Sequence, residues 1–203
     1  MAKRMPEPLV LASSSPTRAL LLAKAGIEVE IDFAAVDEAE LKRESRARGE
    51  DAESCALRLA EAKARHVAPR HPGALVLGAD QMLECDGHWF DKPRNLAAAR
   101  EQLIALNGRR HALVTAAAII RDGKALWHVV ERAVLTMRHF SDAFLDRYLG
   151  VMGEQVLATV GAYELEGLGA QLMTQVEGDY FTILGLPLLP LMAFLRDEGI
   201  LSR

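Results

Sequence analysis

Leu9-Val10-Leu11-Ala12-Ser13-Ser14-Ser15-Pro16-Thr17-Arg18 is the stretch that decides the fold. Its aliphatic residues predict a short buried strand. Ser15 suits a helix N-cap and Pro16 the first helical position, so a helix is expected to start directly after the strand. Such a start presents free backbone N–H groups and a positive dipole end, which bind anions. The positive charge of Arg18 is unfavourable at this positive end of the helix dipole, so an anion such as phosphate is expected nearby. The alternative is an ordinary capped helix with a solvated arginine.

The composition is that of a globular protein with a sizeable core. The chain has 203 residues, of which 50% are hydrophobic and 26% charged, and its net charge is −4. An acidic balance argues against nucleic-acid binding through a broad basic surface, although it does not exclude a local cationic pocket. Cys55 and Cys85 match no zinc spacing and indicate free thiols in a reducing compartment.

No targeting or membrane-spanning segment is expected from the sequence. The first residues, 1–8, are charged and contain two prolines, and no long apolar stretch follows them. The most apolar late stretch, 183–195, contains prolines and is too short to span a bilayer. We therefore expect a cytoplasmic protein with no membrane partner.

Hydrophobic periodicity predicts alternating strands and helices. The segment 42–51 is highly charged and is expected to be a mobile surface connection, with Asp37 and Glu38 in a loop before it. The order of elements favours a mixed sheet flanked by helices in a single domain, residues 1–203. Strands are expected at 9–11, 27–33, 74–79, about 82–85, 111–120, 125–137 and 171–176, and helices at 16–25, 52–67, 95–107, 141–148 and 188–195.

Acidic and basic residues suited to phosphate chemistry stand at several element ends. Asp80 follows a buried strand, where open α/β sheets bind their ligands. Glu38 offers a second acid, and convergent carboxylates hold Mg²⁺ when it also binds phosphates. Lys63 and Lys92 are candidate phosphate ligands. The alternatives are a structural ion pair for Asp80, an acidic turn that leads a helix at Glu38, and solvated lysines.

No phosphate loop, dinucleotide fingerprint or serine nucleophile motif is present in the sequence. The remaining acids and bases suit a metal-activated water that attacks phosphorus. Taken together, the motifs resemble the Maf family of nucleoside triphosphate pyrophosphatases from about Leu9 to Gly199. They are Ala12-Ser13-Ser14-Ser15-Pro16-Thr17-Arg18, Asp37-Glu38, Arg58-Leu59-Ala60 with Lys63-Ala64, Gly78-Ala79-Asp80, Lys92-Pro93, Gly161-Ala162-Tyr163, Glu166-Gly167-Leu168-Gly169-Ala170, Gly178-Asp179-Tyr180 and Gly185-Leu186-Pro187-Leu188.

The resemblance implies an elongated mixed sheet flanked by helices, with two lobes and a nucleotide cleft between them. It implies hydrolysis between the α and β phosphates of a nucleoside triphosphate, with a divalent cation, Mg²⁺ or Mn²⁺, and commonly a homodimer. A non-catalytic nucleotide sensor coupled to cell-division arrest is the alternative. Carried over by position, the implied roles are water activation by Asp80, metal binding by Glu38 and Asp80, triphosphate binding by Arg18, Lys63 and Lys92, and an anion-binding turn at Ser13 and Ser15.

The resemblance implies that three residues, Thr17, Gln81 and Glu166, determine the base preference. Gln81 and Glu166 resemble the branch that acts on 7-methylguanosine triphosphate, and a glutamate could accept from the N1–H and N2–H₂ edge of guanine. Thr17 stands where that branch often has tryptophan, and Tyr163 is closer to the branch acting on thymidine and uridine triphosphates. A pyrimidine substrate is therefore the alternative.

Overall fold

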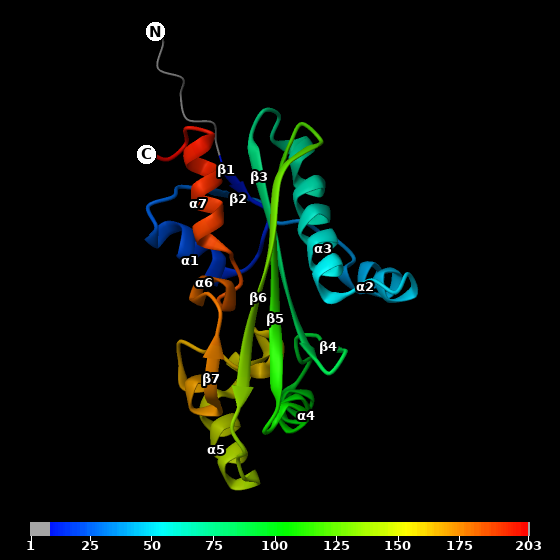
Figure 1. Cartoon of the computed structure of the whole chain (residues 1–203), viewed down its shortest axis with the longest axis vertical. Coiled ribbons are helices and arrows are strands. Elements are labelled where there is room, and N and C mark those ends of the chain that lie inside the picture. Colours follow the sequence, from blue (N-terminus) through cyan, green and yellow to red (C-terminus); the bar gives the residue numbers. More distant parts are fainter. Residues whose placement is uncertain (1–8, 203) are drawn as a thin grey trace. The chain divides into compact units, whose positions relative to one another are not determined.

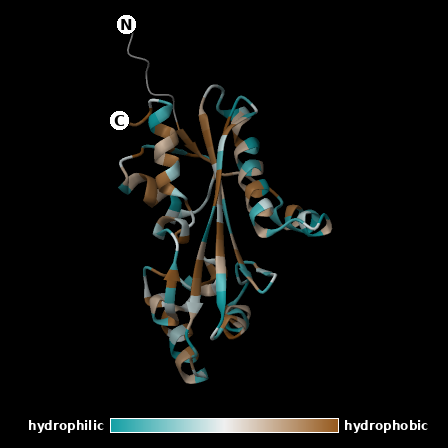
Figure 2. Cartoon of the chain, viewed as in Figure 1, coloured by the Kyte–Doolittle hydropathy of each residue, from teal (hydrophilic) through white to brown (hydrophobic). Residues whose placement is uncertain are grey.

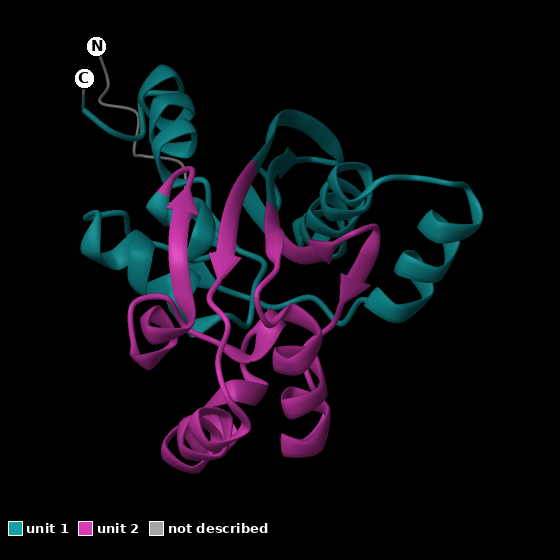
Figure 3. Ribbon diagram, turned by 60° about the horizontal axis from the view of Figure 1, so that its bottom comes forward, with its two compact units in different colours: residues 1–80, 115–131, 180–203 teal, residues 81–114, 132–179 magenta. Residues whose placement is uncertain are grey.

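The computed structural model describes residues 9–202. Residues 1–8, on which the expectation of no secretion signal rests, lie outside this range. The chain divides into two compact units (Figure 3). Unit 1 comprises residues 1–80, 115–131 and 180–203, and unit 2 comprises residues 81–114 and 132–179.

Within residues 9–202 the strands form one seven-stranded mixed sheet, which confirms the predicted fold class. Its order is β2-β1-β3-β5-β6-β7, with β4 paired to β3. β1 pairs in parallel with β2 and β3, whereas β3–β4 and β6–β7 are antiparallel. The strands are β1 (Leu9–Leu11), β2 (Glu30–Ile31), β3 (Leu75–Cys85), β4 (His88–Phe90), β5 (Arg110–Arg121), β6 (Lys124–Met137) and β7 (Met173–Glu177) (Figure 1).

Most predicted helices form where their caps and apolar stripes placed them. Ser15, Asn95 and Ser141 each accept a hydrogen bond from the backbone N–H three residues later, as N-caps do. The helices are α1 (Pro16–Lys24), α2 (Glu38–Ala47), α3 (Ala52–Val67), α4 (Leu96–Leu106), α5 (Asp142–Met152), α6 (Tyr180–Ile183) and α7 (Leu188–Asp197), with 3₁₀ turns η1 (Ala68–Arg70), η2 (Gly153–Leu157), η3 (Val160–Ala162) and η4 (Leu168–Leu172).

Three sequence predictions about elements are wrong. The strand expected at 27–33 is reduced to the two residues of β2. The segment expected to be a mobile connection forms most of α2, and Asp37 is the N-cap of that helix and not a loop residue. Asp80 does not end a strand, because β3 continues through it to Cys85.

The strands of unit 1 separate two hydrophobic clusters. Leu75 and Leu77, at odd positions of β3, pack with α1 and α7. Val76, at an even position of β3, and Ala74, which directly precedes the strand, pack with α3. Successive side chains of a strand point to opposite faces, so Gly78 and Asp80 are expected on the α3 face. Figure 1 shows α1 and α7 on one side of β3 and α3 on the other, and Figure 2 shows hydrophobic and hydrophilic residues alternating along α3.

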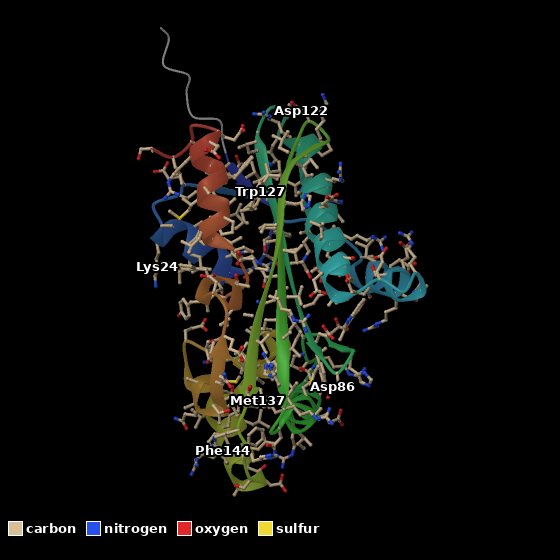
Figure 4. The ribbon with its side chains drawn as sticks, in the orientation of Figure 1. Lys24, Asp86, Asp122, Trp127, Met137 and Phe144 are labelled. Carbon is tan, nitrogen blue, oxygen red and sulfur yellow. The ribbon has the colours of Figure 1, made fainter. Side chains whose placement is uncertain are left out.

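The hairpins follow their predicted turns. Asp86 and Gly87 both have positive φ, as a two-residue turn requires, and they join β3 to β4 in register at Cys85 and His88. Asp122 and Gly123 also have positive φ, and they join β5 to β6. Figure 4 labels Asp86 and Asp122 at the tips of these hairpins. Within residues 9–202, no helix has the length and hydropathy that crossing a membrane requires.

Unit 2 contains a buried polar pair next to a strained turn. Nε2 of His111 lies 2.7 Å from the hydroxyl of Tyr163. Gly161 and Ala162, which precede this tyrosine, both have positive φ, which is uncommon for alanine. The hydroxyl of Tyr148 donates to the carbonyl of Ala162 at 3.0 Å and helps to hold this conformation.

Candidate active site

The turn between β1 and α1 is organised around the Arg18 side chain. Oγ of Ser15 accepts from the N–H of Arg18 at 3.4 Å, and Oγ of Ser13 accepts from the N–H of Ser15 at 3.3 Å. The guanidinium folds back over this turn, where Nη1 donates to Oγ of Ser13 at 3.0 Å. Nε donates to the carbonyl of Gly185 at 2.7 Å. Arg18 is therefore buried and held, and not a solvated arginine.

Lys63 joins the two predicted acids. Its Nζ lies 2.6 Å from Oδ1 of Asp80 and 2.8 Å from Oε1 of Glu38. Asp80 is 5% exposed, and its Oδ2 is buried with no hydrogen-bond partner among the described residues. An unpaired buried carboxylate oxygen is unfavourable, so this atom is suited to receive a ligand.

Close packing of α3 on β3 brings Lys63 to Asp80. A Cβ at Gly78 would lie 2.9 Å from the backbone nitrogen of Ala64 and closer still to the carbonyl oxygen of Ala60. The helix axis therefore approaches the strand more closely than any other residue at Gly78 permits. Because Lys63 lies within this close contact on α3, its amine reaches the carboxylate two residues beyond Gly78.

Arg18 belongs electrostatically to the same cluster. Burial lowers the pKa of Arg18 below its usual value, while the negative charges of Asp80 and Glu38 act in the opposite direction. A guanidinium stays protonated at neutral pH even so. Two cations, Arg18 and Lys63, and two carboxylates thus lie together in unit 1, which is the arrangement expected for a phosphate and a cation bound side by side.

Arg58 holds α2 against α3 and so fixes the helix that begins at Glu38. Its Nη1 donates to Oγ of the buried Ser45 at 2.8 Å and to Glu50 at 3.2 Å, and its Nη2 donates to Glu44 at 2.9 Å. These bonds tie α2 to α3 through a side chain of α3. A charged surface helix with little apolar stripe is thereby kept in place.

A family model described as a Maf-like protein matches residues 8–198 of the chain. The chain belongs to the Maf family. This Maf chain is 55% identical over 190 residues to a protein of Paramagnetospirillum magneticum named nucleoside triphosphate pyrophosphatase, which covers 94% of this chain and 98% of that protein. It is 50% identical over 198 residues to a protein of Mesorhizobium japonicum named 7-methyl-GTP pyrophosphatase, covering 98% and 100%.

A solved structure of a nucleoside-triphosphatase, a dITP/XTP pyrophosphatase from Mycobacterium abscessus, aligns with a TM-score of 0.49 and 19% identity, covering 94% of this chain and 97% of that chain.

The predicted site residues are divided between the two units. Ser13, Ser15, Arg18, Glu38, Lys63 and Asp80 all belong to unit 1, as does Thr17, which is half-buried in the first turn of α1. Gln81, Lys92 and Glu166 belong to unit 2. Gln81 follows Asp80 on β3, Lys92 is exposed after β4, and Glu166 is exposed in the loop before η4.

The loop of this Maf protein that carries Glu166 also contains a second glutamate. Burial raises the pKa of Glu164, and the charge of Glu166 raises it further. The loop is tight, because a Cβ at Gly169 would collide with the backbone of Glu164. Glu164 was not predicted as a site residue.

Sequence reasoning missed three polar residues that are linked by hydrogen bonds to Gly185, whose carbonyl accepts from Arg18. They are Thr115 on β5, Glu131 on β6 and Thr182 on α6, all in unit 1. The sequence gives one signal for Thr115, because it is a lone polar residue within the apolar run 112–120. Thr182 follows Gly178-Asp179-Tyr180, a motif of the family resemblance to which no role had been assigned.

Glu38 and Asp80 provide only part of the ligand set that a divalent cation requires. No group of three or more His, Cys, Asp or Glu side chains that could hold a metal occurs within residues 9–202. Mg²⁺ needs only one or two protein carboxylates when substrate phosphates and water complete its shell. Asp80 and Glu38 meet that smaller requirement. Oδ2 of Asp80 is buried without a partner among the described residues, and Lys63 contacts both carboxylates.

Proposed function

We propose that this Maf protein is a nucleoside triphosphate pyrophosphatase that releases pyrophosphate and leaves the nucleoside monophosphate. The names of relatives about 50% identical over nearly the whole chain support this activity. The observation that carries it is the buried Asp80, whose Oδ1 is ion-paired to Lys63 while its Oδ2 has no partner among the described residues.

In this proposal Asp80 is the base that accepts a proton from the attacking water. Lys63 contacts this carboxylate at 2.6 Å and holds Glu38 beside it through a second ion pair at 2.8 Å. Arg18, with the turn at Ser13 and Ser15, binds phosphate oxygens of the substrate. Lys92 is assigned to the triphosphate by its family motif.

Glu38 and Asp80 are the residues that would hold a divalent cation, Mg²⁺ or Mn²⁺. Such an ion neutralises phosphate charge and lowers the pKa of a bound water. A homodimer and a cytoplasmic location are further parts of the proposal, and both derive from the family resemblance and the composition. A role in cell-division arrest stays an expectation of the family resemblance.

The proposed base is 7-methylguanine. Three relatives named 7-methyl-GTP pyrophosphatase are 46–50% identical to this chain, and Gln81 and Glu166 fit that branch. We expect Glu166→Gln to change the ranking of bases, because an amide offers a donor where the carboxylate only accepts. Arg18→Ala should weaken all triphosphates alike. An unchanged ranking in Glu166→Gln would contradict the base assignment.

The activity is tested by measuring pyrophosphate release from canonical, 5-methylated, 7-methylated and deaminated triphosphates with Mg²⁺ or Mn²⁺. Asp80→Asn should reduce turnover by about 10²–10⁴-fold, as loss of a general base does. Asp142→Asn is the matched control, because that side chain is 86% exposed in unit 2. Undiminished turnover in Asp80→Asn, or no turnover of any triphosphate by the wild-type protein, would contradict the proposal. Tight binding without hydrolysis would instead favour the sensor.

A further inference from the structure

The turn between α6 and α7 supplies a main-chain acceptor for the Arg18 side chain. Nε of Arg18 donates to the carbonyl oxygen of Gly185 at 2.7 Å. The preceding helix, α6, has four residues. A helix of one turn is marginal alone, because nucleation is unfavourable and tertiary contacts must offset it. The position of the Gly185 carbonyl therefore depends on what holds α6 in place.

Two buried threonines connect α6 to the parts of β5 and β6 that belong to unit 1. Oγ1 of Thr115 on β5 donates to the carbonyl of Thr182 at 2.9 Å. The N–H of Gly185 donates to that same carbonyl at 3.0 Å. Oγ1 of Thr182 donates to Oε2 of Glu131 on β6 at 2.5 Å. A continuous series of hydrogen bonds thus runs from both strands through α6 to the residue that binds Arg18.

Burial makes these hydrogen bonds hard to replace. Thr115 is 0% and Thr182 1% exposed, so water does not substitute for a lost partner. The hydroxyl of Thr182 donates to a carboxylate, and such charge-assisted bonds are among the stronger ones. Valine has nearly the same shape at both positions, so packing alone does not require the hydroxyls.

We propose that Thr115, Glu131 and Thr182 are positioning residues that hold the Gly185 carbonyl where it orients the Arg18 guanidinium. They act through that carbonyl and do not touch the substrate. Arg18 then presents Nη2, which neither of its two side-chain hydrogen bonds uses, to a phosphate oxygen. The inference rests on the proposed function, in which Arg18 binds the triphosphate.

Thr182→Val removes the hydroxyl and keeps the volume of the side chain. We expect its affinity for inorganic triphosphate, measured by calorimetry, to fall by about tenfold. KM for the nucleotide should rise by a similar factor with little change in kcat, since Arg18 binds substrate and transition state alike. Thr182→Ser should restore both values. Thr174→Val is the matched control, because its exposed Oγ1 only donates to the carbonyl of Thr136.

A double-mutant cycle distinguishes positioning from a general structural effect. In the Arg18→Ala background, Thr182→Val should change the affinity for inorganic triphosphate no further. Additive effects of the two substitutions would overturn the inference, as would wild-type affinity in a folded Thr182→Val protein.

Thr115→Val tests the other hydrogen bond in the same way if Thr182→Val does not fold. A wild-type protein that binds no inorganic triphosphate also overturns the inference. A wild-type protein that binds it but releases no pyrophosphate from any nucleotide overturns only the proposed function, because the affinity comparison still holds.

Discussion

At Gly78 a single methyl group separates the observed packing of α3 from a clash. The backbone of Ala60 and Ala64 occupies the space that a Cβ would need. We expect Gly78→Ala to lower the free energy of unfolding by about 1–3 kcal/mol, as overpacking does, and to reduce pyrophosphate release because Lys63 moves away from Asp80. Urea denaturation and activity measure the two effects.

Gly150→Ala is the control for that substitution. Gly150 lies within α5 and nothing lies within 4 Å of the position of its Cβ, so alanine should preserve or raise stability. Equal stability of Gly78→Ala and the wild-type protein would contradict the account of close packing.

His111 makes stability depend on pH. Burial lowers the pKa of His111 from its usual 6.5 to about 4. The unfolded chain therefore binds a proton first as the pH falls, so stability is lost between pH 6.5 and 4 and is fully present above that range. Between pH 7.5 and 5 we expect a loss of about 2 kcal/mol from this residue.

Urea denaturation at both pH values tests this expectation. His111→Gln should show a smaller loss between pH 7.5 and 5 than the wild-type protein, because glutamine does not titrate. His88→Gln, at an exposed position in β4, should behave as the wild-type protein does. Equal losses in all three proteins would refute the assignment.

Candidate site residues could be predicted from the sequence where a local pattern marks them. Ser15 and Arg18 stand at a capped helix start, and Lys63 falls at the edge of the apolar stripe of residues 52–67. Thr182 and Glu131 have no such pattern, because their function depends on a contact between residues 51 positions apart. Lys63 is not the solvated lysine of the alternative interpretation, since it is buried and contacts two carboxylates of the protein.

At the scale of elements, α3 and α2 show what periodicity can predict. The apolar stripe at 52–67 marks both ends of α3, because that helix buries one face against β3. Residues 38–47 contain a single leucine and many charges, so their sequence has no stripe that predicts a helix. α2 forms because Asp37 caps it and Arg58 binds it to α3.

Removal of the Arg58 guanidinium should release α2. We expect Arg58→Met to increase hydrogen exchange of the α2 amides strongly while exchange in α3 changes little, because methionine keeps the apolar stem but none of the hydrogen bonds. Activity should fall as well, since Glu38 begins α2. Hydrogen exchange followed by mass spectrometry provides the measurement.

Arg65→Met is the control on the same helix, since Arg65 is exposed and binds Glu61 and the carbonyl of Gly123. Unchanged protection of α2 in Arg58→Met would show that other contacts hold it.

At the scale of the whole molecule, three strands pass from one unit into the other. β3, β5 and β6 each contain a boundary between the units, at Asp80–Gln81, Val114–Thr115 and Glu131–Arg132. The sequence predicted a mixed sheet but divided β3 at Asp80, because a charge within a buried strand normally ends it. The ion pair with Lys63 stabilises that charge and allows the strand to continue.

Shared strands should make the two units unfold together. The chain has two tryptophans, Trp89 on β4 of unit 2 and Trp127 on β6 of unit 1, which stacks on Phe194 of α7. We expect Trp89→Phe and Trp127→Phe proteins, each with one remaining probe, to report the same urea midpoint as circular dichroism does for the same protein. Fluorescence and circular dichroism midpoints that differ within one variant would mean that the units unfold separately.

The hydrogen bond between Arg18 and Gly185 has a consequence for the order in which the chain is synthesised. A ribosome completes the segment with Arg18, Glu38, Lys63 and Asp80 early, yet the carbonyl that orients Arg18 emerges more than a hundred residues later. A nascent or prematurely terminated chain therefore carries the charges of the site without their anchor. In the proposed function, competence to bind a nucleotide then arises only after Gly185 has been synthesised.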